Sequence, residues 1–378
     1  MAKALILPRK VLKARPGPTG GEAMKILHTA DLHLRSDADE RWQALIALLE
    51  LGSREKIDLL VICGDLFDRG ADLRRLQDSV RQVFSGLPFT VLVLPGNHDA
   101  AAFGAGLYLG DSAAVLDDWQ RPFEQESTVV WGLPFEPLGG KEILGRLHAM
   151  TARAAADRRR HLLLLHGELL DAFFSRRELG EEGSERYMPV RLSYFQQLPF
   201  DAVLAGHFHA GFRVWSLERD RYFVYPGSPV SVTRRETGRR KVNLFTAGGP
   251  PGEYALDTFH FAEIVIKLDP FTTAGPLEQV RAALAGLHPA ARFLVTVGGY
   301  IDGTAGCSEA ELAAQVRSLV EGRSAAAPVF TFKDIGTILA DDLFRAFQAR
   351  LEQEEGSPAE KERRRELALR AMMEVKLC

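Results

Sequence analysis

The sequence predicts an α/β protein with two mixed β-sheets packed as a sandwich and flanked by helices, and three observations support this. From Met24 onward, apolar strand-sized runs alternate with amphipathic helical segments, as in a parallel α/β core. Later strand-like runs are shorter and have hairpin-like connections, which indicates a second sheet. A β-α-β-α-β pattern restarts after residue 260, and two helical segments end the chain. We therefore also expect a small β/α capping domain and C-terminal helices.

The core elements follow from hydrophobic periodicity. Continuous apolar runs predict buried strands at residues 24–29, 58–63 and 89–94. Apolar residues at helical spacing predict helices over residues 39–51 and 73–84. Five later runs predict shorter strands: residues 161–165, 202–205, 213–217, 222–225 and 241–245. Together these elements define a predicted catalytic domain.

The chain divides into four expected segments. Residues 1–23 are basic and end in a Pro/Gly-rich stretch, so we expect a disordered extension. The catalytic domain covers residues 24–250 and stops at a GGPPG run. The capping domain covers residues 260–336, and a helical pair covers residues 339–378. The second helix of that pair should begin with a capping box, formed by three residues: Ser357, Pro358 and Glu360.

Composition excludes several classes of protein. The 378 residues are 46% hydrophobic and 26% charged, which is typical of a globular chain and excludes a disordered or collagen-like one. The three cysteines (Cys63, Cys307 and Cys378) are scattered, which favours a reducing, cytoplasmic compartment and disfavours a cysteine-ligated metal. No apolar run is long enough to span a membrane. A net charge of -3 means that any nucleic-acid contact requires a local basic patch.

Polar side chains gather where the predicted strands end. They form five short motifs: Asp31-Leu32-His33, Gly64-Asp65, Gly96-Asn97-His98-Asp99, His166-Gly167 and Gly206-His207-Phe208-His209. Ligand sites of open α/β sheets lie outside the carboxyl ends of strands. Residues two apart in an extended segment face the same way, so each D-x-H or H-x-H pair can reach one ion. Each motif alone is weak evidence, since an H-x-H is often structural and a GNHD can be a plain turn. Five motifs in this order point to one shared site.

This series of motifs resembles the calcineurin-like metallophosphoesterases, which hold two metal ions, and the resemblance covers residues 24–245. Within that superfamily three further motifs resemble the SbcD-type DNA double-strand-break-repair nucleases: GDLFD, VWGLPF and YPGSPVS. The resemblance implies seven metal ligands: Asp31, His33, Asp65 and His209 for the first ion, and Asp65, Asn97, His166 and His207 for the second. Ligation by Asp, Asn and His suits manganese, iron or zinc better than magnesium or calcium, and the resemblance implies manganese.

The resemblance also assigns catalytic roles. It places His98 where the family stabilises the transition state and protonates the leaving oxygen. Asp99 either orients His98 or caps the following turn. Asp68 either bonds the ligand loop or caps a helix. The implied reaction is phosphodiester hydrolysis by a hydroxide generated at the metal ions.

Basic residues and the terminal helices give two further hypotheses. Five cations follow the YPGSP motif: Arg234, Arg235, Arg239, Arg240 and Lys241. They either contact DNA phosphates or form a solvated hairpin tip. A polar loop with Arg176, Arg177 and Arg186 has weaker support as a groove lining. The terminal helices either pack on themselves or dock on an SMC-like ATPase, as the resemblance implies.

The sequence thus predicts a cytoplasmic two-metal-dependent DNA exonuclease in DNA repair, with DNA and an SMC-like ATPase as partners. The resemblance also implies a homodimer. One alternative is a small-molecule phosphodiesterase or phosphomonoesterase, which has little need of the predicted capping domain. A second alternative is a DNA-end-binding scaffold with incidental nuclease activity, and the complete ligand set argues against it.

Overall fold

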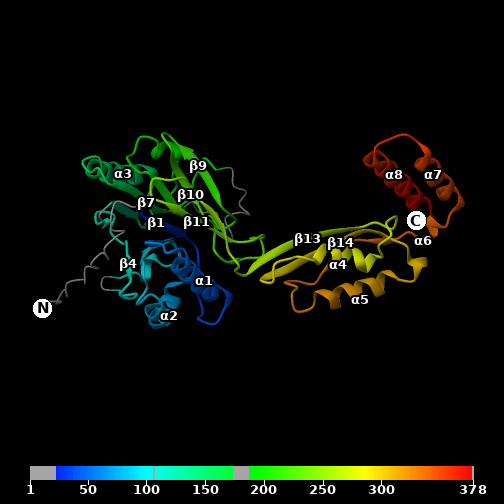
Figure 1. The fold of residues 1–378 in the computed structure, drawn as a ribbon, viewed down its shortest axis with the longest axis horizontal. Coiled ribbons are helices and arrows are strands. Elements are labelled where there is room, and N and C mark those ends of the chain that lie inside the picture. The colour runs from blue at the N-terminus through cyan, green and yellow to red at the C-terminus, as the bar shows by residue number, and fades with distance from the viewer. Residues whose placement is uncertain (1–22, 105–106, 126, 173–186, 377–378) are drawn as a thin grey trace. The chain divides into compact units, whose positions relative to one another are not determined.

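The computed structural model describes residues 23–104, 107–125, 127–172 and 187–376. The chain forms two compact units, Met1–Phe261 and Ala262–Cys378, which we call the first and second unit (Figure 1). Nearly all of the expected N-terminal extension and the three loop arginines Arg176, Arg177 and Arg186 lie outside the described residues. Within the described ranges, we find no helix with the length and apolar character that crossing a membrane requires.

The first unit contains two six-stranded mixed sheets, as predicted. The first sheet has the order β12-β11-β1-β2-β3-β4. Its strands are β1 (Lys25–Thr29), β2 (Leu59–Cys63), β3 (Thr90–Leu94), β4 (Ala113–Val115), β11 (Lys241–Thr246) and β12 (Glu253–Ala255). Strands β1 to β4 are parallel, and β11 and β12 are added antiparallel. The carboxyl ends of the parallel strands therefore share one edge.

The second sheet repeats this plan with the order β5-β6-β7-β8-β10-β9. Its strands are β5 (Phe123–Glu124), β6 (Thr128–Leu133), β7 (Arg160–His166), β8 (Ala202–Gly206), β9 (Arg213–Leu217) and β10 (Arg221–Tyr225). Strands β6, β7, β8 and β10 are parallel, and the edge strands β5 and β9 are antiparallel. This sheet therefore also has a single edge of carboxyl ends.

Three apolar clusters hold these layers together. Helices α1 (Glu40–Glu55) and α2 (Gly70–Val83) pack on the first sheet, and α3 (Gly140–Ala154) packs on the second. A third cluster, with Ile26, Val61 and Leu164, fills the space between the sheets. Helix α1 begins where Asp39 accepts hydrogen bonds from two backbone amides, as an N-cap does. The two sheets are thus fixed face to face by their buried sides.

The sequence missed four strands and one α-helix of this unit: β4, β5, β6, β12 and α3. Strand β6 covers most of the VWGLPF motif and is wholly buried. Helix α3 begins at Gly140, after a glycine N-cap, and its four buried apolar or small residues are spread over four turns. Because glycine has no side chain that can cap a helix, the sequence gives only a weak signal for the start of α3. Helix α2 begins three residues before the predicted start.

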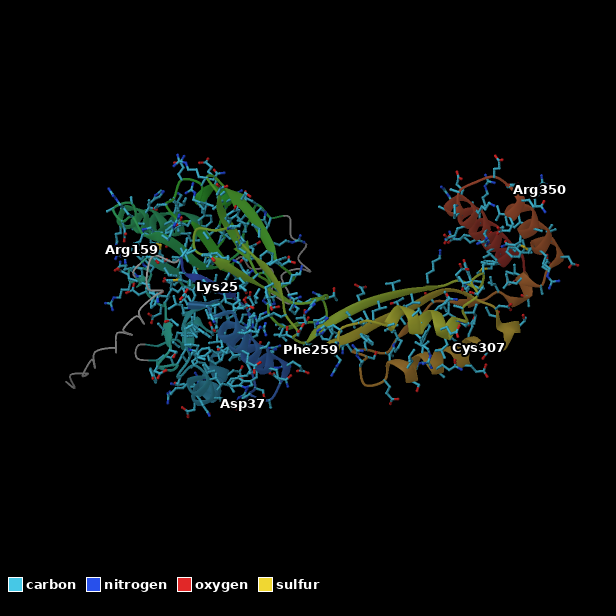
Figure 2. The ribbon with its side chains drawn as sticks, viewed as in Figure 1. Lys25, Asp37, Arg159, Phe259, Cys307 and Arg350 are labelled. Atoms are coloured by element: carbon cyan, nitrogen blue, oxygen red, sulfur yellow. The ribbon has the colours of Figure 1, made fainter. Side chains whose placement is uncertain are left out.

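The second unit contains a small sheet, two helices packed against it and three terminal helices. The sheet is formed by β13 (His260–Leu268), β14 (Ala291–Ile301), β15 (Val329–Phe330) and β16 (Lys333–Asp334). Helices α4 (Pro276–Leu284) and α5 (Glu309–Val320) share its apolar core. Cys307 lies just before α5 in this unit (Figure 2). Cys63 is buried at the end of β2 in the first unit.

The terminal helices form a separate small cluster within the second unit. They are α6 (Gly336–Leu339), α7 (Asp342–Gln353) and α8 (Pro358–Lys376). Phe344 and Leu369 are buried between them with Ile335 and Ile338. The predicted capping box of α8 is confirmed, because the amide of Glu360 donates to Ser357 Oγ and the carboxylate accepts from the Ser357 amide at 2.9 Å.

Candidate metal centre

The loops at the carboxyl ends of the parallel strands bring the predicted side chains to one place. They come from both sheets: Asp31 and His33 follow β1, Asp65 follows β2, Asn97 and His98 follow β3, His166 ends β7, and His207 and His209 follow β8. Six of these residues fall into three overlapping groups whose ligand atoms lie within 4.8 Å of one another. The first sheet supplies both carboxylates, and the second supplies three imidazoles.

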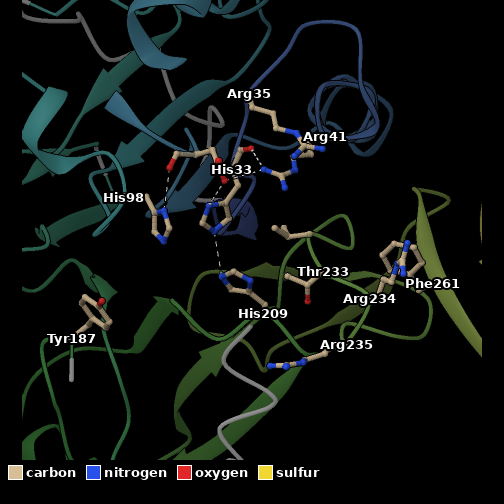
Figure 3. A pocket seen from close by; sticks show the side chains of 12 residues that line it. His33, Arg35, Arg41, His98, Tyr187, His209, Thr233, Arg234, Arg235 and Phe261 are labelled. Atoms are coloured by element: carbon tan, nitrogen blue, oxygen red, sulfur yellow. Dashed lines mark hydrogen bonds and ion pairs between the residues drawn. The ribbon is translucent and has the colours of Figure 1, made fainter. Parts of the chain in front are cut away.

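The first group is Asp31, His33 and His209. The Nε2 atoms of His33 and His209 face each other at 3.3 Å (Figure 3). Asp31 Oδ1 lies 3.7 Å from His209 Nε2. Two imidazole nitrogens and a carboxylate oxygen that converge in this way form a donor set suited to a divalent ion.

The second group is Asp31, Asp65 and His166. His166 Nε2 lies 3.3 Å from Asp65 Oδ2 and 2.8 Å from Asn97 Oδ1. The ring of His207 lies 5.3 Å from that of His166, and its backbone amide donates to Asp31. Asn97 and His207 therefore border this group, as the resemblance implies.

The outer nitrogens of three imidazoles are held by oxygen atoms. His166 Nδ1 lies 2.9 Å from the Cys63 carbonyl oxygen. His33 Nδ1 lies 3.4 Å from Asp68 Oδ1, and His209 Nδ1 lies 3.3 Å from Glu236 Oε1. A metal-binding histidine characteristically donates its second N–H to a carboxylate or carbonyl, which directs the lone pair of the other nitrogen to the ion. The His166 and His209 rings show this arrangement, with Nε2 facing the centre, whereas His33 Nδ1 is only within ion-pair distance of Asp68.

The backbone at the centre is strained and tightly packed. Asp31, His33 and Asp65 have φ angles of 57°, 50° and 51°, and L-residues seldom adopt this left-handed conformation. A Cβ atom at Gly64 would overlap the His166 ring, and one at Gly96 would overlap the Asp65 carboxylate. Side chains at these two positions would fill the space in which the ligands meet. Strain of this kind clusters at functional sites.

The charges at the centre also fit divalent cations. Burial raises the pKa of Asp31 despite the imidazoles around it. Burial also acts to raise the pKa of Asp65, but the neighbouring imidazoles of His166 and His33 outweigh it and hold that pKa far below its usual range. Burial acts to lower the pKa of His166, yet Asp65 raises it to about 10. Two fully buried carboxylates need positive charge beside them, and metal ions would supply it.

Comparison with known proteins identifies the domain that carries this centre. A family model described as calcineurin-like phosphoesterase matches residues 24–211. These residues form a calcineurin-like metallophosphoesterase domain. The chain is 26% identical over 234 residues to a DNA double-strand break repair protein Mre11 of Sulfurisphaera tokodaii, covering 56% of this chain and 55% of that one. It is 24% identical over 267 residues to a subunit of the SbcCD nuclease of Escherichia coli, covering 59% and 65%.

The similarity does not extend over whole proteins, because the chain spans between about half and two thirds of the length of these relatives. Among solved structures, a Thermus thermophilus protein matches with a TM-score of 0.39 and 15% identity, covering 58% of this chain and 94% of its own. A dimetal phosphatase from Danio rerio matches with a TM-score of 0.38 and 11% identity, covering 62% and 99%.

His98 and Asp99 have different surroundings in the phosphoesterase domain. His98 is exposed and lines the pocket over the centre, with its Nδ1 3.1 Å from the Asp68 carbonyl oxygen. Asp99 is buried and accepts hydrogen bonds from the amides of Gly96 at 2.8 Å and Phe67 at 3.0 Å. Burial, together with the Asp65 charge, raises the pKa of Asp99 to about 8. These bonds anchor two ligand loops to each other, and the turn that follows, Ala100–Ala102, takes no side-chain cap bond from Asp99, so the capping role is not supported.

The five cations of the basic cluster are also placed differently. Arg234 and Arg235 are exposed and line the pocket over the centre. Arg239 pairs with Asp257, and Lys241 pairs with Glu253 at 2.7 Å. Arg240 is only 2% exposed and donates to backbone carbonyl oxygens. Its buried guanidinium cannot reach a DNA phosphate, so we leave Arg240 out of the proposed DNA-contacting set.

Two residues near the ligands were not identified from the sequence. Arg41 is buried and donates from Nη1 to the His33 carbonyl oxygen at 2.6 Å and to Asp68 Oδ1 at 3.0 Å. Asp68 therefore bonds the ligand loop, the first of its two predicted roles, and its pKa is lowered by His33 and Arg41 although burial opposes this. Glu236 is buried against His209. Neither Arg41 nor Glu236 belongs to a strand-end motif, so sequence spacing gave no signal for them.

Proposed function

We propose that this protein is a two-metal-dependent DNA exonuclease that acts in DNA repair. The observation that carries the proposal is one pocket of about 750 Å³ in the first unit. It brings the candidate metal ligands His33 and His209 and the exposed His98 together with Arg234 and Arg235. Phosphate contacts from arginine hold a nucleic-acid strand regardless of sequence. A phosphoesterase centre bordered by such arginines is suited to a polyanionic diester.

For the ligands we keep the division that the resemblance implies. Asp31, His33, Asp65 and His209 would hold one ion, and Asp65, Asn97, His166 and His207 the other, with manganese as our choice of metal. When bound, two divalent ions supply an activated water and neutralise charge on the phosphate.

The protein's own groups would then orient the diester and complete the proton transfer. Arg234 and Arg235 would bind the flanking phosphates. The Asp68 carbonyl oxygen accepts from His98 Nδ1, which leaves Nε2 of the imidazolium to donate a proton to the leaving oxygen.

The names of the relatives support DNA as the substrate, because two of them are a break-repair protein and a nuclease subunit. We extend the proposal to an SMC-like ATPase as partner, bound by the terminal helices. Leu343 of α7 and Leu367 of α8 offer apolar surface for such a contact, since their side chains are 73% and 59% exposed. We further propose a cytoplasmic homodimer, for which sedimentation of the purified protein is the test.

Degradation of end-labelled linear DNA by the purified protein with Mn²⁺ tests the nuclease proposal. Bis-p-nitrophenyl phosphate and p-nitrophenyl phosphate serve as parallel substrates, and His98→Ala serves as the control variant. We expect progressive shortening from the ends that the variant lacks. Hydrolysis of the small esters with intact DNA, both alone and with a candidate ATPase, would instead establish a small-molecule phosphoesterase.

A further inference from the structure

One buried carboxylate joins the metal centre to the loop that borders it. Glu236 Oε1 lies 3.3 Å from His209 Nδ1 and accepts from the amide and the hydroxyl of Thr233, each at 3.1 Å. Its Oε2 accepts from the Val232 amide at 2.8 Å and from Ser228 Oγ at 3.0 Å. Four donor groups and the Nδ1 atom of His209 therefore converge on a side chain that is only 1% exposed. Such a set matches an ionised carboxylate, which only accepts hydrogen bonds.

Arg240 completes this network from the other side. Its guanidinium donates to the carbonyl oxygens of His209 and Ala210 and, from Nε at 3.0 Å, to that of Ser228. It also donates to Ser228 Oγ at 3.1 Å. The backbone of His209 is thus held by Arg240, while its imidazole is held by Glu236. The two ionised groups hold the same residue by different atoms.

We propose that Glu236 is a positioning residue that fixes the imidazole of His209 for metal binding and, through the same carboxylate, fixes the loop that carries Arg234 and Arg235. The metal part stands on the geometry of the centre. The DNA part rests on the proposed nuclease function. Because Glu236 bonds both His209 and the loop that carries Arg234 and Arg235, a disturbance of one should also disturb the other.

The physical reason lies in the tautomer of His209. An acceptor at Nδ1 keeps the proton there, so Nε2 presents its lone pair towards Asp31 and His33. In Glu236→Gln the side chain has the same size, but its NH₂ group must face donors. With the amide nitrogen at the Oε1 position, His209 and Thr233 lose their acceptor, and with it at the Oε2 position, the Val232 amide and Ser228 Oγ lose theirs. A neutral amide oxygen is also a weaker acceptor for His209 than a carboxylate, so the variant weakens the ion site in either orientation without removing any ligand.

Calorimetric titration of Mn²⁺ into the metal-free protein tests the proposal. We expect Glu236→Gln to bind the ion at the His209 site 10–100-fold more weakly than the wild type. Glu55→Gln is the matched control, because Glu55 pairs with Lys25 at the start of β1, the opposite end of the strand from the ligands. We expect its Mn²⁺ binding to match that of the wild type. If Glu236→Gln melts earlier but binds Mn²⁺ like the wild type, Glu236 has only a structural role and the proposal is overturned.

A measurement on the wild-type protein decides the question even if the variant does not fold. In ¹⁵N-histidine NMR spectra of the metal-free protein at alkaline pH, we expect His209 to carry its proton on Nδ1. A proton on Nε2 would overturn the proposal.

The loop is tested separately with DNA. Replacing Arg234 and Arg235 by alanine should raise KM for DNA and leave Mn²⁺ affinity unchanged, whereas Glu236→Gln should change both. Unaltered KM in Glu236→Gln beside a raised KM in the arginine variant would overturn the loop part. If no protein cleaves DNA, the nuclease proposal fails while the Mn²⁺ titration still tests the metal part.

Discussion

The two units of the chain differ in whether they bury polar side chains. Among the residues that the structure describes, every buried polar or charged side chain lies at or before His260. The non-glycine residues with positive φ also fall between Asp31 and Asp220. In the second unit the described ion pairs lie on the surface, such as Lys267 with Glu362 at 3.1 Å and Arg365 with Glu352 at 2.9 Å.

This contrast distinguishes the unit that carries the candidate metal centre from the unit that does not. Buried charges and left-handed backbone cost stability, and a fold keeps them where they serve a site. The two packed sheets of the first unit provide the rigid core that tolerates them. The second unit has an ordinary apolar core and exposed leucines on its terminal helices. The candidate metal centre lies in the first unit, and our proposal places partner contact in the second.

The largest effect should follow loss of the central carboxylate. Asp65→Asn removes a charge that faces His166 and His33, and it weakens the acceptor for the His98 amide, now at 2.9 Å. We expect hydrolysis of bis-p-nitrophenyl phosphate to fall to background because the ions lose their shared ligand. Activity within tenfold of the wild type would contradict this role. Metal content of the purified variant, measured beside it, should fall as well.

Removing the proposed general acid should have the next largest effect. His98→Ala should lower kcat for DNA by about 10²–10⁴-fold, because proton transfer to the leaving oxygen contributes about that much. Retained DNA affinity, measured by fluorescence anisotropy, would show that binding is intact. A p-nitrophenyl leaving group needs little protonation, so the small diester should lose less activity than DNA. Equal losses on both substrates would argue against the acid role.

The arginines offer a contrast within the first unit. Replacing Arg234 and Arg235 by alanine should weaken DNA binding and lower the slope of log K against log salt by about 1 per lost phosphate contact. Arg240→Met should instead lower the free energy of unfolding by about 3–5 kcal/mol, because it leaves the buried Glu236 without its cationic neighbour. Chemical denaturation checks the second effect. If Arg240→Met changes only DNA affinity, the distinction between these arginines is wrong.

The terminal helices should matter for partner binding alone. Substituting Leu343 and Leu367 by aspartate should abolish co-purification with a co-expressed SMC-like ATPase and leave ester hydrolysis unchanged. Both side chains are exposed, so the substitution should not disturb the buried cluster around Phe344. Deleting the residues after Leu339 should have the same result. Unchanged ATPase binding in the deletion would contradict the proposed docking role.

The last effect concerns pH and a buried histidine outside the metal centre, and it is absent at neutral pH. Burial lowers the pKa of His28 in β1 from 6.5 to about 3. The unfolded chain therefore takes up a proton below pH 6.5 that the folded protein excludes, and stability falls as the pH drops from 6.5 towards 3. The slope contributed is up to about 1.4 kcal/mol per pH unit. Unfolding of metal-free wild type and His28→Leu should diverge over that range, and parallel curves would contradict the assignment.

Local sequence signals were enough to predict the two-sheet fold and the gathering of polar side chains at the strand ends. Apolar runs that end in Asp65, Asn97 or His166 carry both the strand and its candidate ligand in adjacent residues. The networks that hold the ligands depend instead on long-range contacts. Glu236 lies in a sequence that resembles a solvated turn, and only the packing of its loop against His209 shows that it is buried. The role of Asp99 likewise depends on the approach of a distant loop at Phe67.

Anomalous scattering from Mn²⁺-soaked crystals of the full chain tests the central claim most directly. The account predicts two peaks in the first unit, one beside Asp31, His33 and His209 and the other beside Asp65 and His166. It also predicts that both peaks weaken in Asp65→Asn crystals soaked in the same way. Absence of peaks from these ligands in the wild type, or peaks that the variant leaves unchanged, would contradict the account.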